Sequence, residues 1–187
     1  MKIIGITGTI GAGKGTIVDY LVNHYGFKHY SVRNYLIEEA KRQNLPLNRD
    51  TYVLIANKLR ETHSPSFIID ELYKEAAKTG NDAIIESIRT PGEIASLRKK
   101  EGFTLWAVDA NPKIRYERIV ARQSETDQIS FETFLSNEQR EMNATDPTKQ
   151  NLAACIRCAD VVFVNNDNFE RLFEKVEEKL SANSLFG

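Results

Sequence analysis

The 187-residue chain is poor in the residues on which several classes of protein depend. Its two cysteines, Cys155 and Cys158, are too few for a disulfide framework, so we expect a reducing, cytoplasmic compartment. A formal net charge of −1 gives no electrostatic reason to expect a nucleic acid or an anionic membrane as a partner. No apolar run approaches the length that crosses a bilayer, and Gly5 interrupts the apolar start, unlike in a signal peptide.

Metal-binding motifs are also scarce. Cys155 and Cys158 form a lone C-x-x-C at the end of a predicted helix, and the three histidines have no ligand spacing. We therefore expect two thiols that pack a helix, because free cysteine is usually buried. The zinc signature of nucleobase deaminases is absent, which excludes that chemistry.

What the chain does contain is a glycine-rich loop between an apolar segment, Ile3–Ile6, and an amphipathic one, Ile17–Val22. The loop reads Gly8-Thr9-Ile10-Gly11-Ala12-Gly13-Lys14-Gly15-Thr16. A strand, a tight glycine loop and a helix in this order are the context of a phosphate-binding P-loop. Glycines let successive N–H groups converge on one anion, and the helix adds its N-terminal N–H groups and its dipole. We therefore predict that all nine residues bind the phosphates of ATP.

Two side chains of the loop carry the chemistry. Lys14 supplies a movable positive charge for the β- and γ-phosphates. The position after it is Gly15, so the hydroxyl that can hold Mg²⁺ comes one residue later, at Thr16. This GKGT ending is characteristic of adenylate kinase and its relatives.

Strand-like and helical segments alternate along the whole chain, which predicts a parallel sheet covered by helices on both faces in one domain, 1–187. The five strand-like segments are residues 3–6, 27–30, 83–85, 103–108 and 161–164, and residues 181–187 are expected to be a frayed tail. Ligands of such sheets bind at the carboxyl ends of the strands. The segments there are Gly8–Thr16, Ser31–Arg33, Glu86–Arg89, Asp109 and Asn165–Asn166.

Two charged residues follow the third predicted strand. Glu86 ends it, and a carboxylate beside a P-loop is suited to hold Mg²⁺ or its water shell. Arg89 follows three residues later and could grip an acceptor phosphate with two hydrogen bonds. The alternative for this pair is a helix-capping acid and a solvated arginine.

A third group of candidates lies on the helix predicted after Asn111-Pro112. Arg115, Arg118 and Arg122 share one helical face, where three like charges repel unless phosphates supply the opposite charge. For Arg115 a structural role is as consistent with the pattern as a functional one, whereas Arg118 and Arg122 favour phosphate contact. Arg140, beyond the next predicted helix, could close on the same phosphates.

With these motifs the chain resembles a nucleoside monophosphate kinase of the adenylate kinase type. The last third, with Gln150 and the segment Ala159–Asp167, is more similar to dephospho-CoA kinase and to the kinase-like portion of some deoxycytidylate deaminases. The resemblance implies a P-loop kinase fold with a five-stranded parallel sheet in the order 2-3-1-4-5. It also implies an acceptor-binding helical insert at about 32–80 and a lid at about 123–145, hinged near 124–128.

The resemblance also implies roles for particular residues. Lys14 and Arg122 would contact the transferred phosphoryl group, Arg118 and Asn166 would lie on the ATP side, and Arg33, Glu86, Arg89 and Arg140 would face the acceptor. One departure concerns the helix after the second strand, where relatives carry an arginine and this chain has Ile37. Arg33, one turn earlier, could substitute for it, or the acceptor differs from an ordinary nucleotide.

These inferences predict an enzyme that uses ATP and Mg²⁺ to phosphorylate a small molecule, with a nucleoside or deoxynucleoside monophosphate as the expected acceptor. A dephospho-CoA kinase is the alternative enzyme. An ATP-binding regulatory module that gates a partner is the alternative of another class. We expect no nucleic acid or membrane partner, and a monomer or a homodimer.

Overall fold

The core of the molecule is a five-stranded sheet in which neighbouring strands are parallel. A computed structural model describes residues 1–122, 129–143 and 149–184. The strands are β1 (Ile3–Gly8), β2 (Lys28–Ser31), β3 (Ala83–Glu86), β4 (Phe103–Asp109) and β5 (Val161–Val164). Their order in the sheet is β2-β3-β1-β4-β5, so the predicted fold class and strand order are confirmed.

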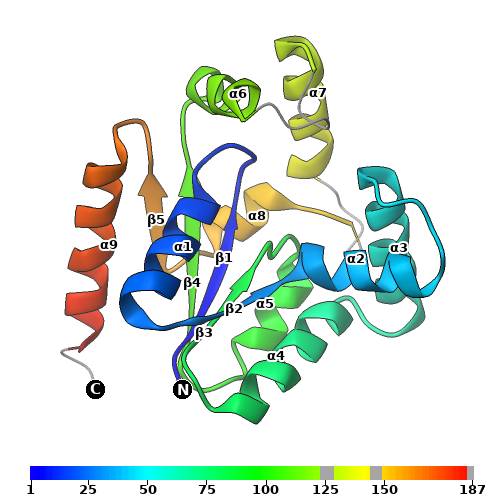
Figure 1. Cartoon of the computed structure of the whole chain (residues 1–187), viewed down its shortest axis with the longest axis horizontal. Coiled ribbons are helices and arrows are strands. Elements are labelled where there is room, and N and C mark those ends of the chain that lie inside the picture. The colour runs from blue at the N-terminus through cyan, green and yellow to red at the C-terminus, as the bar shows by residue number, and fades with distance from the viewer. Residues whose placement is uncertain (123–128, 144–148, 185–187) are drawn as a thin grey trace.

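Helices connect the strands and cover both faces of the sheet (Figure 1). They are α1 (Lys14–Tyr25), α2 (Val32–Arg42), α3 (Arg49–Thr62), α4 (Phe67–Thr79), α5 (Pro91–Leu97), α6 (Pro112–Ala121), α7 (Phe131–Met142), α8 (Leu152–Arg157) and α9 (Phe169–Ser184). The prediction of a frayed tail at residues 181–187 is partly wrong, because the amphipathic helix α9 continues to Ser184. Among the described residues, no helix is both long and apolar enough to span a membrane.

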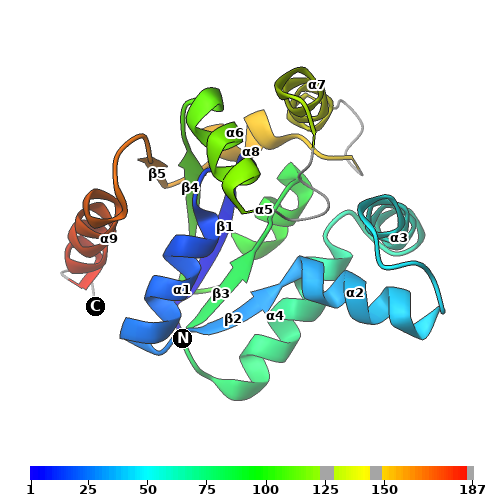
Figure 2. The same ribbon diagram turned by 45° about the horizontal axis from the view of Figure 1, so that its top comes forward.

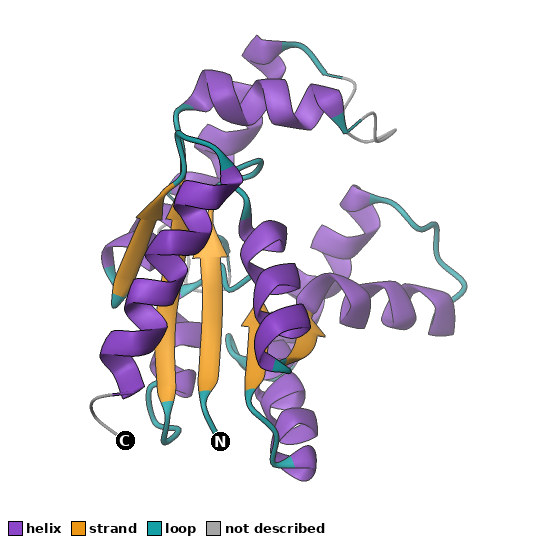
Figure 3. Ribbon diagram, turned by 60° about the vertical axis from the view of Figure 1, so that its left-hand side comes forward, coloured by secondary structure: helices purple, strands orange, loops and turns teal. Residues whose placement is uncertain are grey.

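Alternating side chains of the buried strands divide the core into two clusters. In β1, Ile3 belongs to the cluster beneath α2, α4 and α5, whereas Ile4 belongs to the cluster beneath α1 and α9. Period-two alternation on both faces is what a parallel sheet requires, since helices cover each side. Helices accordingly lie on both sides of the strands (Figure 3), and α9 lies beside α1 at the end opposite α3 (Figure 1).

The expected acceptor insert and the described part of the expected lid are largely helical. Residues 32–80, the expected acceptor insert, form α2, α3 and α4. Of the expected lid, α7 is described, while its expected hinge at 124–128 lies outside the described residues. Helices α3 and α7 project on the same side of the molecule, away from α9 (Figures 1 and 2).

Candidate functional site

The P-loop turns sharply between β1 and α1 because its glycines adopt backbone conformations that other residues rarely reach. Gly8, Gly11 and Gly13 have φ angles of 133°, 77° and 104°. A Cβ atom at Gly8 would lie 2.0 Å from the carbonyl oxygen of Val108 on β4, so the loop leaves the sheet against a neighbouring strand. This close fit leaves the N-terminal end of α1 beside the carboxyl ends of β1 and β4.

Lys14 lies folded against the loop that carries it. Its Nζ donates hydrogen bonds to the carbonyl oxygens of Gly8 at 3.0 Å and Thr9 at 2.8 Å. Burial lowers the pKa of Lys14 to about 8, and the charge of Arg89 adds to this effect against the opposing charge of Glu86. The ammonium group is therefore held by neutral carbonyls and is poorly compensated, which favours its movement toward an incoming phosphate.

Glu86 is the last residue of β3. Its Oε2 lies 3.0 Å from Nε2 of His29, on the adjacent strand β2. Burial raises the pKa of Glu86, but the His29 hydrogen bond and the charges of Lys14 and Arg89 outweigh it and hold that pKa below its ordinary value. The carboxylate is thus ionised, and an ionised carboxylate is the kind of group that can hold a metal ion or its water shell.

Arg89 lies beside this cluster, and it is held by residues that the sequence interpretation did not assign. Its Nη1 donates to Oε2 of Glu141, on α7, at 2.9 Å and to Oε1 of Gln150 at 2.8 Å. Its backbone N–H donates to Oε2 of Glu93, on α5, at 2.8 Å. The arginine expected to grip an acceptor phosphate is therefore anchored through its backbone and occupied by a carboxylate.

Glu93 is the buried residue that organises this part of the site. Its Oε1 accepts two hydrogen bonds from the guanidinium group of Arg60, on α3, and its Oε2 accepts from the backbone N–H groups of Arg89 and Thr90. Thr90 and Glu93 complete a capping box at the start of α5. The acid that caps α5 is therefore Glu93 and not Glu86, for which a helix-capping role was the alternative.

Arg118, on α6, is hydrogen-bonded to the loop after β5. Arg118 donates to the carbonyl oxygens of Asn165 at 3.0 Å and Asp167 at 3.3 Å. The Asn165 side chain is buried and donates to the carbonyl of Ala12 at 2.8 Å. Asn166, which we expected to bind ATP, instead accepts a hydrogen bond from the backbone N–H of Asn111 at 2.7 Å. In this structure Asn165 is the residue of the pair that supports the P-loop.

Arg115 is a structural residue that connects the P-loop to α7. Its guanidinium group is 3% exposed and donates to the carbonyl oxygens of Ala110 and Ile10. The same group forms an ion pair with Glu138, on α7, at 2.8 Å. Of the two interpretations that the sequence left open for Arg115, these contacts favour the structural one.

The other predicted residues are spread around this centre. Arg122 caps α6 and lies close enough to Lys14 for its charge to lower the pKa of that lysine, and Thr16 is half-buried in the first turn of α1. Arg140 lines a cavity of about 520 Å³ between α3 and α7. Arg33 is exposed on the first turn of α2, and no described hydrogen bond or ion pair joins it to the cluster.

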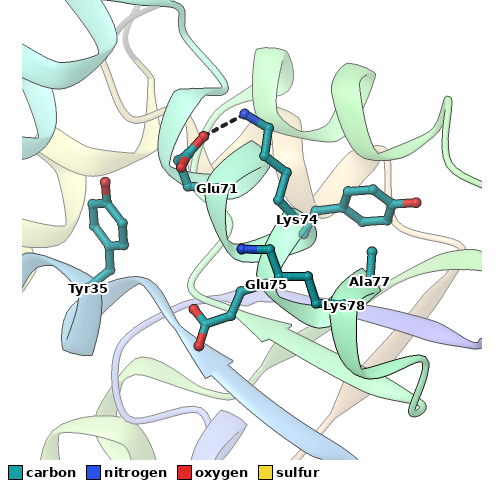
Figure 4. A pocket seen from close by; sticks show the side chains of 7 residues that line it. Tyr35, Glu71, Lys74, Glu75, Ala77 and Lys78 are labelled. Atoms are coloured by element: carbon teal, nitrogen blue, oxygen red, sulfur yellow. Dashed lines mark hydrogen bonds and ion pairs between the residues drawn. The ribbon is translucent and has the colours of Figure 1, made fainter.

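A second cavity, of about 830 Å³, lies away from this centre over the outer face of α4 (Figure 4). Six of its seven lining residues belong to α4, among them Lys74 and Glu71, which pair with each other at 2.7 Å. Tyr35, from α2, faces them. Since these charged side chains pair among themselves at the surface, we assign this cavity no role in phosphate binding.

The sequence interpretation missed four residues that the structure brings to the site. They are His29, Arg49, Glu93 and Glu141. Only Glu93 had a local signal, because Thr90-Pro91-Gly92-Glu93 has the spacing of a capping box before an apolar residue. The other three meet their partners across separate elements, and no spacing along the chain links them.

A P-loop at the end of the central strand of a 2-3-1-4-5 parallel sheet, with charged residues at the neighbouring strand ends, defines a P-loop kinase-like protein. A family model described as an AAA domain matches residues 4–144. The chain is also 31% identical over 183 residues to a UPF0200 protein of Methanococcus vannielii, with 96% of this chain and 95% of the relative covered. It therefore belongs to the AAA domain family and to the UPF0200 family.

Solved structures support the same fold. Protein TT1252 of Thermus thermophilus has a TM-score of 0.64 at 20% identity, with 97% of each chain covered. Shikimate kinase of Bacteroides thetaiotaomicron has a TM-score of 0.59 at 12% identity, with 96% of this chain and 98% of that chain covered. A gluconokinase of Sinorhizobium meliloti has a TM-score of 0.57 at 12% identity, covering 99% and 96%. At such identities the likeness concerns the fold, which this chain shares with small-molecule kinases.

Proposed function

We propose that this chain is an ATP-dependent phosphotransferase that transfers a phosphoryl group from Mg-ATP to a nucleoside or deoxynucleoside monophosphate. The observation that carries the proposal is the meeting of Lys14, Glu86, Arg89 and Arg122 beside the P-loop. They come from three segments, which are the P-loop, the end of β3 with its following loop, and the end of α6, and the charges of the other three act on Lys14. Three cations beside a phosphate-binding loop, with the carboxylates of Glu86 and Glu141 close to them, suit phosphoryl transfer, which depends on positioning and charge neutralisation.

The residues present fit ATP and Mg²⁺. The backbone cradle from Gly8 to Gly13 leaves no room for side chains at its tightest points, and the α1 N-terminus adds N–H donors. Thr16 and the ionised Glu86 offer the oxygen ligands that Mg²⁺ prefers. When bound there, Mg²⁺ would neutralise negative charge on the phosphates.

In this proposal the chain's own residues divide the work between donor and acceptor. Lys14 leaves the carbonyls of Gly8 and Thr9 and follows the phosphoryl group, while Arg122 approaches from the end of α6. Arg118 and Asn165 hold the donor side of the loop. Arg89 holds the acceptor phosphate, because its backbone is already fixed by Glu93.

The state of Glu86 supports an acceptor that needs no general base. A general base works best with a pKa near the operating pH, whereas the pKa of Glu86 lies below its ordinary range. A hydroxyl acceptor needs such a base, but a phosphate oxygen is already ionised. We therefore favour a monophosphate over a hydroxyl acceptor.

The exposed position of Arg33 favours a second candidate. If Arg33 does not reach the acceptor, it does not replace the arginine missing at Ile37, and this departure favours an acceptor other than an ordinary nucleotide. Dephospho-CoA is then the acceptor to test. An ATP-binding regulatory module without a small-molecule acceptor is the remaining alternative.

A coupled ADP-release screen over nucleoside monophosphates, deoxynucleoside monophosphates and dephospho-CoA tests the proposal. We expect at least one monophosphate to stimulate ADP release strongly. Stimulation by dephospho-CoA alone would favour the second candidate. Turnover that no acceptor increases would favour the regulatory module and contradict both enzymes.

Arginine variants then assign the acceptor side. Arg89→Lys should raise the acceptor KM tenfold to a hundredfold, because a lost bidentate charged contact costs roughly 1.5–3 kcal/mol, while the KM for ATP barely moves. Arg33→Lys should do the same if Arg33 replaces the missing arginine. Arg42→Lys, at an exposed position on α2, is the matched control. If Arg89→Lys instead raised the KM for ATP and left the acceptor KM unchanged, Arg89 would belong to the ATP side and not to the acceptor side.

A further inference from the structure

Glu141 joins two arginines from different parts of the chain. One of its carboxylate oxygens accepts from Nη2 of Arg49, at the start of α3, and the other accepts from Nη1 of Arg89 at 2.9 Å. Its charge also acts on Lys14. The Glu141 side chain is only 16% exposed, whereas its partners Arg49 and Arg89 are 47% and 29% exposed, so the carboxylate is the more deeply buried member of both pairs.

These ion pairs span a cavity and not a packed interface. Helix α7 packs against α6 and α8, whereas α3 packs against α2 and α4. Between α3 and α7 lies the cavity of about 520 Å³, with Arg49, Arg140, Glu141 and Gln150 in its wall. An ion pair that only held two helices together would be expected where they touch. Glu141 instead lies beside space for a small molecule, next to the arginine assigned to the acceptor.

We propose that Arg49 and Arg89 form an anion site for a dianionic phosphate, and that the Glu141 carboxylate occupies this site until such a phosphate displaces it. Identifying this phosphate as that of the acceptor rests on the proposed function. Glu141 thereby determines specificity for the charge of the ligand, and Arg49 becomes a second acceptor-binding arginine.

The charges explain why displacement is selective. A neutral group that displaced Glu141 would leave two guanidinium groups without an anion, which is costly in a half-buried site. A monoanion would only exchange one negative charge for another. A phosphate monoester carries close to two negative charges above its second pKa, about 6, and offers three acceptor oxygens to the two guanidinium groups.

Calorimetric titration of the whole chain with two matched probes at pH 8 tests the site without turnover. Saturating Mg·ADP first fills the P-loop. We expect methyl phosphate, a dianion, to bind at least about tenfold more tightly than dimethyl phosphate, a monoanion of similar shape, since one charged hydrogen-bonded contact is worth that much. Equal affinities for the two probes would overturn the proposal on the wild-type chain alone.

Variants of α7 then test the displaced carboxylate. Glu141→Gln should increase the affinity for methyl phosphate about tenfold, which is the effect expected when the Glu141 carboxylate occupies the anion site in about nine-tenths of the molecules. The affinity ratio between methyl phosphate and dimethyl phosphate should become smaller. Glu132→Gln, which removes a charge from an exposed position on the same helix, should change neither affinity. Weaker methyl phosphate binding in Glu141→Gln, with a normal cooperative melt, would show that Glu141 is structural and would refute the displacement.

Arginine variants test the site itself. Arg49→Gln should weaken methyl phosphate about tenfold or more while leaving Mg·ADP binding unchanged, and Arg42→Gln should weaken neither ligand. Unchanged methyl phosphate binding in Arg49→Gln would remove Arg49 from the site. Failure of the proposed function is detected by a different experiment, the ADP-release screen, in which no monophosphate would then stimulate ADP release. A chain that binds methyl phosphate as described but phosphorylates no monophosphate would keep the anion site and lose the assigned reaction.

Discussion

The buried ion pair between Arg60 and Glu93 allows a prediction about stability in which the two partners are unequal. Their side chains are 3% and 1% exposed, and the Arg60 Nη2 atom lies 2.9 Å from Oε1 of Glu93. Glu93 also accepts from the backbone N–H groups of Arg89 and Thr90, whereas the hydrogen bonds found for Arg60 all go to Glu93. Loss of the Glu93 carboxylate therefore leaves the buried Arg60 guanidinium group without its anion. Loss of Arg60 leaves the Glu93 carboxylate with two hydrogen-bond donors, the backbone N–H groups of Arg89 and Thr90.

The magnitudes follow from this difference. Glu93→Gln should lower the free energy of unfolding by about 3–5 kcal/mol, the usual cost of breaking a buried pair from one side. Arg60→Met should cost less, about 1.5–3 kcal/mol, because the two backbone N–H groups still compensate Glu93. The double variant should lose clearly less than the sum of the two, since neither charge is then left alone. Against a typical total of roughly 5–15 kcal/mol these are large effects.

Urea unfolding followed by circular dichroism measures all three variants, with similar m-values as the condition for comparing them. Glu174→Gln, which breaks an exposed pair with Arg171 on α9, is the control and should leave the midpoint unchanged. Because Glu93 fixes the backbone of Arg89, the Glu93→Gln variant should also raise the acceptor KM more than Arg60→Met does. Equal losses from the two single variants, or strict additivity in the double variant, would refute this account of the pair.

Three further predictions concern the P-loop. Lys14→Ala should lower the rate of phosphoryl transfer by about 10²–10³ with an unchanged cooperative melt, because the lysine stabilises transition-state charge and not the core; near-normal turnover would contradict the assignment. Since the pKa of Lys14 falls from 10.5 to about 8 on folding, the unfolded chain binds more protons than the folded chain between these pH values, and the free energy of unfolding should rise with pH across that window. An amine-selective reagent at pH 8–9 should label Lys14 before the other lysines unless ATP is present. Uniform labelling of all lysines, measured by mass spectrometry, would argue against the lowered pKa. Gly8→Ala should destabilise the fold sharply, because the new Cβ would lie 2.0 Å from the Val108 carbonyl oxygen. In Gly15→Ala the new Cβ meets no described atom within 4 Å, so this variant should leave the thermal midpoint unchanged or higher. Similar midpoints for the two variants would disprove the close approach at Gly8.

The sequence alone determined the fold and the position of the P-loop in it. Apolar segments of strand length alternating with helical patterns require a covered parallel sheet, and the glycine pattern from Gly8 to Gly13 has a local mechanism that needs no distant residue. The rule that ligands gather at the carboxyl ends of parallel strands then selected Glu86 and Arg89, which the structure brings to Lys14. The fold prediction succeeded because it depends on a general property of such sheets, whereas the roles of Glu86 and Arg89 stay predictions.

Only the tertiary structure brought together the residues of the proposed acceptor side of the site. Arg49, Arg89 and Glu141 come from positions far apart in the sequence, and their contact depends on how α3 and α7 are placed around one cavity. The same reason applies to Arg115, whose contacts with the carbonyl of Ile10 and the carboxylate of Glu138 favour the structural one of its two roles. A charged side chain has no periodicity that reveals its partner, so the sequence could propose the phosphate-binding arginines but could not show that a glutamate of the same chain occupies one of them.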